Sequence, residues 1–146
     1  MAEVKGNLPY HIWRFSNNLY RMNVPLLPFI VQQFLRFGFC CMVPYKTRIG
    51  KDVHFSHMGM GIVIHPLSVI GDRVKIFQHV TIGGRNDTGL PIIGDDVEIG
   101  ANAVVLGGVK VGKNAKIGAN AVVIHDVPEG CTAVGNPARV LVPKKG

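Results

Sequence analysis

Aliphatic or aromatic side chains recur at every sixth position over most of the chain, and the positions between them are largely polar, small or glycine. The recurring residues form three blocks, each with its own phase: Val43, Ile49 and Phe55; Ile64, Ile70, Ile76 and Ile82; Ile93, Ile99, Val105, Val111, Ile117 and Val123. A glycine directly follows seven of these thirteen residues. A repeat this long indicates the architecture, because each unit buries its apolar face only against its neighbours.

A six-residue period fits neither the 3.6-residue turn of an α-helix nor the simple alternation of a long strand. It fits a short strand of β-branched residues followed by a corner that glycine eases. Stacked coils would let each strand hydrogen-bond to the equivalent strands above and below it. Three such hexads per coil give a triangular prism of about four coils. The sequence therefore predicts a mainly β protein, with a parallel β-helix over residues 41–140 and a short tail at 141–146.

The first 40 residues show helical spacing instead. Apolar residues follow one another three or four positions apart in two stretches, and prolines stand at the join. The two apolar stripes are Ile12, Phe15, Leu19 and Met22, and Leu27, Ile30, Val31, Phe34 and Phe37. We expect two short amphipathic helices whose apolar faces pack on the prism or on a neighbouring subunit. The alternative is that one face makes peripheral contact with a membrane or docks on a partner enzyme.

Composition and charge narrow the classes of protein. Hydrophobic residues make up 47% of the chain and charged residues 17%, a balance that excludes a disordered protein. The formal net charge is 16 − 9 = +7, which favours an anionic partner. No basic run is longer than Lys144-Lys145, and the aromatic residues concentrate in the N-terminal segment. We therefore do not expect nucleic acid to be that partner.

The cysteines and the N-terminus bear on the compartment. Cys40, Cys41 and Cys131 are an odd set with an adjacent pair, which fits neither a disulfide framework nor a zinc knuckle. We expect them to be small buried hydrophobic residues in a reducing cytosol. Residues 1–6 lack the apolar core of a signal peptide, and residues 24–43 carry too many prolines and polar residues for a bilayer span. The protein is therefore expected to be cytoplasmic.

Two breaks in the period mark loops, where functional residues of a rigid repeat commonly lie. The interval between repeat residues grows from six to nine around residue 57 and to eleven around residue 87. The first break contains His57, and a histidine can remove a proton from an alcohol or amine. Gly59 and Gly61 flank it and would let a substrate approach the backbone. The second break, residues 84–90, is polar and glycine-rich.

Three motifs resemble a known family. The run F-S-H-M-G-M-G-I-V-I at residues 55–64, with Q-H-V-T-I-G-G at 78–84, resembles the serine acetyltransferase branch of the hexapeptide-repeat acyltransferases and its relatives that O-acetylate surface polysaccharides. The segments V-P-E-G at 127–130 and V-G-N-P-A-R-V at 134–140 are similar to the family's closing segment. The family's fold is a left-handed parallel β-helix. The resemblance implies that hand, which the period alone does not give.

The resemblance also implies an activity and a site. It implies an acetyl-CoA-dependent acetyltransferase, with His57 as general base, in which the acetyl group passes directly to the acceptor. It implies a homotrimer, with acetyl-CoA in a groove along a prism edge between neighbouring subunits. The residues assigned to acetyl-CoA are Gly83, Gly84, Ala101 and Ala119, through their backbone, and Arg139 and Lys144, through their charges. The candidates to support His57 or to contact the acceptor are His79 and Ser56.

Departures from the family bear on the acceptor. Serine acetyltransferases have an aspartate where this chain has Ser56, a D-I-H-P turn where it has M-V-P-Y at 42–45, and a substrate-binding histidine where it has Leu90. The short N-terminal segment is more similar to the polysaccharide-modifying relatives. We therefore expect the acceptor to be a hydroxyl, or an amino group, on a sugar of a surface polysaccharide or its precursor. Free serine is the alternative.

Two other functions share this architecture. The γ-class carbonic anhydrases hold zinc with histidines that include a pair five residues apart, whereas the nearest pairs here are three and eight apart. We therefore expect no metal site. A non-catalytic scaffold or binding module is the other alternative. The regular glycines, His57 and the closing N-P-A-R motif favour an enzyme over it.

Overall fold

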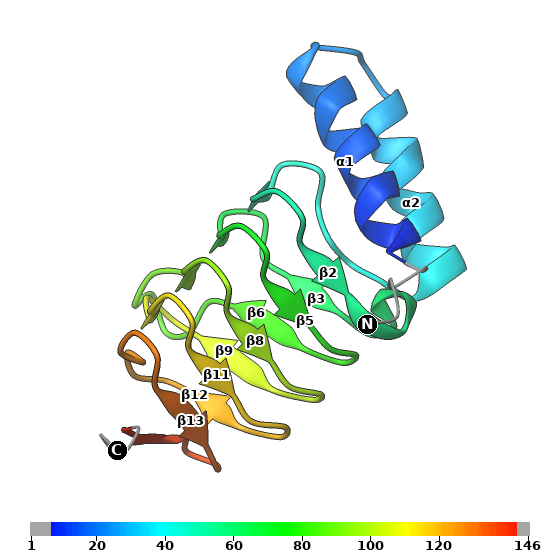
Figure 1. Ribbon diagram of the computed structural model, residues 1–146. Coiled ribbons are helices and arrows are strands. Elements are labelled where there is room, and N and C mark those ends of the chain that lie inside the picture. Colours follow the sequence, from blue (N-terminus) through cyan, green and yellow to red (C-terminus); the bar gives the residue numbers. More distant parts are fainter. Residues whose placement is uncertain (1–6, 143–146) are drawn as a thin grey trace.

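The computed structural model describes residues 7–142, which form a helical hairpin on one end of a three-sided coil (Figure 1). The helices are α1 (Leu8–Arg21) and α2 (Leu27–Phe39). The strands are β1 (Arg48–Ile49), β2 (His54–Phe55), β3 (Val63–Ile64), β4 (Val69–Ile70), β5 (Lys75–Ile76), β6 (Thr81–Gly83), β7 (Ile92–Ile93), β8 (Glu98–Ile99), β9 (Val104–Leu106), β10 (Lys110–Val111), β11 (Lys116–Ile117), β12 (Val122–Val123), β13 (Thr132–Val134) and β14 (Arg139–Leu141). A short 3-10 turn, η1 (Ser56–Gly59), follows β2.

The strands form three sheets, which are the three faces of a prism. Face A holds β3, β6, β9 and β12; face B holds β1, β4, β7 and β10; face C holds β2, β5, β8, β11, β13 and β14. Each of four successive coils adds one parallel strand to each face. Repeat residues stack directly, as in the register of Ile49 on Ile70 and of Ile70 on Ile93. The parallel coil of about four turns that the six-residue period predicts is confirmed.

Inward-facing aliphatic side chains fill the prism. The repeat residues from Ile64 to Val123 are at most 2% exposed, and each fully buried side chain contributes roughly 1.5–3 kcal/mol. The coils also pass close to one another at their corners. A Cβ on Gly94 would lie 2.9 Å from the backbone nitrogen of Lys113 in the next coil, a contact too short for any side chain. Glycine at this corner therefore sets how closely the coils stack.

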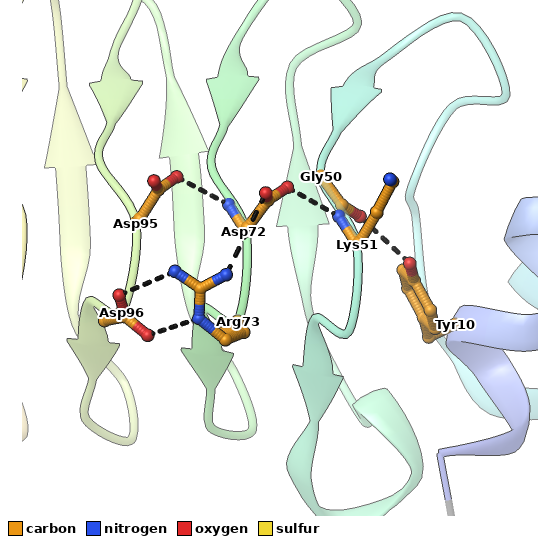
Figure 2. Close-up of polar contacts among 7 residues, drawn as sticks. All are labelled: Tyr10, Gly50, Lys51, Asp72, Arg73, Asp95 and Asp96. Atoms are coloured by element: carbon orange, nitrogen blue, oxygen red, sulfur yellow. Dashed lines mark hydrogen bonds and ion pairs between the residues drawn. The ribbon is translucent and has the colours of Figure 1, made fainter.

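Aspartates join successive coils at the corner between faces B and C (Figure 2). The Lys51 backbone N–H donates to Asp72 over 2.8 Å, and the Asp72 N–H donates to Asp95 over 2.8 Å. Arg73 donates two hydrogen bonds to Asp96, of 2.7 and 2.8 Å. These bonds lower the pKa of the Asp96 carboxyl. Because this pair is exposed, it adds little to stability.

The prism is covered at both ends. The hydroxyl of Tyr10 in α1 donates to the carbonyl of Gly50, and the indole N–H of Trp13 donates to that of Pro44. Both side chains are buried. At the other end β14 runs antiparallel to β13 and is the outermost strand of face C. Each end of face C therefore meets an element that does not continue the parallel coil.

The helices are present as expected, but apart from Ile12, which packs against the core, much of their apolar stripes stays exposed. In α1, Phe15 is 55% exposed, and Met22, directly after that helix, is 73% exposed. In α2 the side chains of Ile30, Phe34 and Phe37 are exposed to a similar degree. The buried side chains are Pro9, Tyr10, Trp13 and Ser16 of α1, and Pro28 and Leu35 of α2. The prediction that the stripes pack on the chain's own prism is thus wrong for these exposed residues and holds for Ile12. The prediction that all cysteines are buried is also wrong, because Cys40 is exposed. Among residues 7–142, no helix combines the length and the apolar character that a membrane crossing requires.

Candidate functional site

The first break in the repeat forms a strained turn at the corner between faces C and A. His57 has φ 51° and ψ 42°, and Met58 has φ 58° and ψ 25°. Gly59 follows with φ 68°. Two consecutive side-chain-bearing residues in the left-handed region cost roughly 1–2 kcal/mol each. This turn leaves the His57 side chain exposed at the corner, and strain of this kind is typical of functional positions.

The surroundings of the His57 ring are aromatic and cationic. Its centroid lies 6.3 Å from that of Phe77, with a 45° angle between the rings. The Nζ of Lys75 lies 4.9 Å from the centroid of the Phe77 ring. Ser56 is buried beside the turn. In the described part of the chain no side chain hydrogen-bonds the His57 imidazole, so Ser56 does not orient it here.

His79 lies one coil further along the same corner. Its backbone N–H donates to the Met60 carbonyl over 2.8 Å. Its ring covers Gly61, where a Cβ would collide with the imidazole. His79 has φ 59°, as do the equivalent corner residues Asn102 and Asn120, with φ 59° and 60°. The structure thus brings His79 next to the His57 turn, in a position that also has a structural role.

Three of the residues assigned to acetyl-CoA continue this corner. Ala101 follows β8, Ala119 follows β11, and Arg139 begins β14 opposite Val134. Ala119 and Arg139 are exposed. The Ala101 carbonyl already accepts the Asn120 N–H over 2.9 Å. With about 4.8 Å between strands, the five strand steps from β2, which precedes His57, to β14, which begins at Arg139, span roughly 24 Å. Lys144 lies outside the described residues.

Gly83 and Gly84 lie elsewhere, at the corner between faces A and B. Within one chain they are therefore not part of the His57 corner, and a groove that includes both sets of residues has to lie between neighbouring subunits, as the family resemblance implied. The Gly83 carbonyl accepts the Gly107 N–H over 3.0 Å. A Cβ on Gly83 would meet nothing within 4 Å, so this chain's own packing does not require glycine there. Gly84 lines an open cleft of about 430 Å³ together with His65 and residues 85–87, 89 and 90 of the second loop.

Face A lies between these two corners and presents uncharged side chains outward, three valines and one threonine. These are Val63, Thr81, Val104 and Val122, one from each coil, and all are exposed or half-buried. Face C instead presents His54, Lys75, Glu98, Lys116 and Thr132. Of the three faces, A is thus the one whose outer surface is free of charge at these positions.

Three residues near His57 had no role in the sequence-based prediction. Phe77 contacts His57, and the Oε1 of Gln78 is buried without a hydrogen-bond partner among the described residues. Gln78 opens the motif at 78–84 and Phe77 directly precedes it, and these positions were the available signal. His54 pairs with Lys75 across face C. Burial, and secondarily the Lys75 charge, lower the pKa of His54.

Burial raises the pKa of the Cys41 thiol to about 12, which makes it a poor nucleophile at neutral pH. Among residues 7–142 no three His, Cys, Asp or Glu side chains converge in a way that would hold a metal ion.

Comparisons with known proteins agree on a family. The bacterial transferase hexapeptide (six repeats) model matches residues 91–125. The probable serine acetyltransferase 1 of Oryza sativa subsp. japonica is 42% identical over 149 aligned positions, covering 100% of this chain and 49% of the relative. The soybean serine acetyltransferase apoenzyme has a TM-score of 0.85 and 40% identity, covering 92% of this chain and 56% of that chain. A serine acetyltransferase in complex with CoA has a TM-score of 0.83 and 38% identity, and the match covers 91% of this chain and 55% of that chain.

The chain belongs to the hexapeptide-repeat transferase family. It spans about half the length of the relatives that it matches. The structural neighbours are left-handed β-helices, and a mirror-image coil could not superpose on them so closely. The left-handed parallel β-helix that the resemblance implied is therefore confirmed.

Proposed function

We propose that this hexapeptide-repeat protein is an acetyltransferase that uses acetyl-CoA as its acetyl donor and a hydroxyl-bearing small molecule as its acceptor. The observation that carries the proposal is the left-handed turn at residues 57–59, which holds an exposed imidazole at the start of a corner roughly 24 Å long. The CoA complex of a neighbour with 38% identity supports the choice of donor.

His57 acts as the general base. It takes the proton of the acceptor hydroxyl while that oxygen attacks the thioester carbonyl, and it returns a proton to the CoA sulfur as the C–S bond breaks. A positioned base of this kind contributes ~10²–10⁴-fold to the rate. The ring faces Phe77 rather than a carboxylate, so packing, and not a charged partner, restricts its orientation.

The complete site requires neighbouring subunits. The apolar outer surface of face A supports a homotrimer in which the His57 corner of one subunit meets the residue 83–90 corner of the next. In that arrangement Ala101, Ala119 and Arg139 line one wall for acetyl-CoA, and Gly83 and Gly84 line the other. Gly83 fits this role, because the open space at its Cβ position would let the cofactor or the neighbouring chain approach its backbone.

Serine and a sugar hydroxyl are the two candidate acceptors. The relatives named above are serine acetyltransferases, which favours serine. Ser56 and Leu90, where those enzymes place an aspartate and a substrate-binding histidine, favour the sugar. In the second loop Arg85 is an exposed cation beside the cleft, and it could pair with the carboxylate of serine. The identities of these few residues, rather than the fold, separate the two acceptors.

An acceptor panel tests the proposal. Acetyl-CoA consumption is measured with serine, nucleotide sugars and oligosaccharides, using the wild type and His57→Ala. We expect one acceptor class to raise consumption, and His57→Ala to remove at least 99% of the increase, the lower limit of a base's contribution. Equal rates for the two proteins would refute the role of His57. If no acceptor raised consumption and a thermal-shift assay detected no binding of acetyl-CoA, the scaffold alternative would replace the enzyme.

A further inference from the structure

The positive charge of the chain is concentrated at the helical end. Residues 7–51 contain six basic residues and no Asp or Glu, a net charge of +6: Arg14, Arg21, Arg36, Lys46, Arg48 and Lys51. Residues 1–6 hold one Glu and one Lys, so residues 52–146 carry 7 − 6 − 0 = +1. The charge that first suggested an anionic partner therefore lies mostly at the end opposite Arg139.

A cleft between α1 and the first coil gathers half of these cations. It has a volume of about 470 Å³, and Arg21, Lys46 and Arg48 line it. No acidic residue does. Ile49 and Ile70 form an apolar part of its wall, and Asn17 and Tyr20 of α1 form a polar part. The cleft contains none of the residues assigned to acetyl transfer.

Within the described range, residues 7–142, the cations of this cleft form no ion pair with an acidic side chain. The ion pairs in this range are those of Arg73 with Asp72 and Asp96, at the corner between faces B and C (Figure 2). A second cavity, of about 320 Å³, shares Arg21 with the cleft and adds Arg14 and Lys51. Its one acidic residue is Asp72, whose carboxylate already accepts the Lys51 backbone N–H and faces Arg73.

Aromatic residues and one side-chain hydrogen bond shape the wall. The rings of Tyr20 and Tyr45 lie 5.1 Å apart, and the Nζ of Lys46 lies 5.7 and 5.9 Å from their centroids. The Asn17 side chain donates to the Tyr45 carbonyl over 2.6 Å, which ties α1 to the turn that carries Lys46. Cations held beside rings in this way keep their charge available to a ligand, because the rings accept no proton and form no ion pair.

We propose that this cleft binds the phosphoryl group of a phosphate ester. Arg21 and Arg48 each offer a planar fork that matches phosphate oxygens, and Lys46 adds a third positive charge. The apolar wall and the Tyr20 ring hold the organic part of the ester. The volume suits a group larger than phosphate itself. The site is independent of the proposed acetyl transfer.

Calorimetric titration tests this site in the full chain at constant ionic strength. The probes are inorganic phosphate, glycerol 3-phosphate, and phosphatidylcholine vesicles with and without phosphatidylglycerol. The site variant is Arg21→Gln with Lys46→Gln and Arg48→Gln. The matched control removes the same charge elsewhere, by Lys110→Gln, Lys113→Gln and Lys116→Gln. Circular dichroism and thermal unfolding check that both variants fold.

We expect at least one phosphate-containing probe to bind, and the site variant to bind it about a hundredfold or more weakly, because three charge-assisted contacts are lost. The control should bind within a few-fold of the wild type. Binding of glycerol 3-phosphate identifies a soluble ester, and binding only of phosphatidylglycerol vesicles identifies a lipid headgroup. Failure of every probe, or equal weakening in the two variants, would overturn the proposal.

Discussion

His57 and His79 both have a left-handed backbone, but His57 lies in a run of such residues. Regular corners of the coil place single Asn, Asp or Arg residues at positive φ, as at Asn102 and Asn114. The turn at 57–59 instead has three such residues in succession, of which only the last is glycine. An imidazole and a thioether are thus held where glycine would be favoured. The chain keeps side chains in a conformation that reduces its stability, and a role for at least one of them explains this.

Glycine substitutions separate strain from chemistry. His57→Gly and Met58→Gly both relieve a left-handed side-chain-bearing residue, so we expect each to leave the free energy of unfolding unchanged or to raise it by up to about 1 kcal/mol. Only His57→Gly should lower the turnover number, by ~10²–10⁴-fold. Thermal unfolding and the thioester assay measure the two effects. Equal turnover in the two variants would exclude His57 as the base.

His54 makes stability sensitive to mild acid. Burial and the neighbouring Lys75 charge lower its pKa in the folded protein. Below the unfolded pKa of about 6.5, the unfolded chain therefore binds a proton that the folded chain takes up only at lower pH. The stabilisation from the neutral ring is complete above that value and is lost as pH falls through the folded pKa. His54→Gln should show a smaller fall in Tm between pH 7 and pH 5 than the wild type.

The irregular turn that carries His57 could be predicted from the sequence, because the break in the period identified the loop. The resemblance supplied the role as general base, which stays a proposal. The contact between His57 and Phe77 could not be predicted from the sequence. A six-residue period indicates which side chains point into the prism, but it carries no information about how outward side chains at a corner meet. The absence of a hydrogen bond from Ser56 to the His57 ring likewise depends on the turn geometry.

At the scale of strands and coils, glycine has two different uses. At Gly94 a side chain would strike the backbone of the next coil, whereas at Gly83 it would project into open space. Both glycines follow a repeat isoleucine, so the sequence presents them as equivalent. Stacking of the coils explains the first glycine. For the second we propose that a ligand or a neighbouring chain approaches its backbone.

Alanine substitutions test this distinction. Gly94→Ala should destabilise the fold by about 1–3 kcal/mol, because the coils must separate to admit a methyl group. Gly83→Ala should leave Tm unchanged or slightly higher and should raise the KM for acetyl-CoA. Thermal unfolding and steady-state kinetics supply the readouts. An unchanged KM in Gly83→Ala would remove this residue from the cofactor wall.

The helices were predicted as elements, but their orientation was not. Helical spacing shows which residues share a face and does not show which face meets the prism. Tyr10 and Trp13 were left out of the apolar stripes, yet they fill the inner face, because their polar tips reach the carbonyls of Gly50 and Pro44. The aliphatic and phenylalanine stripes consequently remain outside.

At the scale of the whole molecule, the proposed site depends on assembly. One chain separates the His57 corner from the residue 83–90 corner by the width of face A, and only a neighbouring copy brings the two corner types together. The apolar outer surface of face A supports that contact. The activity of the protein and its oligomeric state should therefore change together.

A charge on face A tests this dependence. Val104→Lys places an ammonium group in the middle of that face, so we expect light scattering to show monomers and the thioester assay to show little activity. Ile92→Lys makes the same type of change on face B, where Ile92 is 48% exposed, and should remain trimeric and active. A monomeric Val104→Lys protein with full activity would show that the site is complete within one chain.

The constant spacing between the strands of the coil fixes the distance between His57 and Arg139. Each strand spacing adds about 4.8 Å between the imidazole and the guanidinium of Arg139, so one extra coil would carry that cation a full step beyond its position. An extended cofactor held at both ends would no longer reach both groups. The length of the ligand, rather than the stability of the stack, would then limit how many coils lie between these two residues.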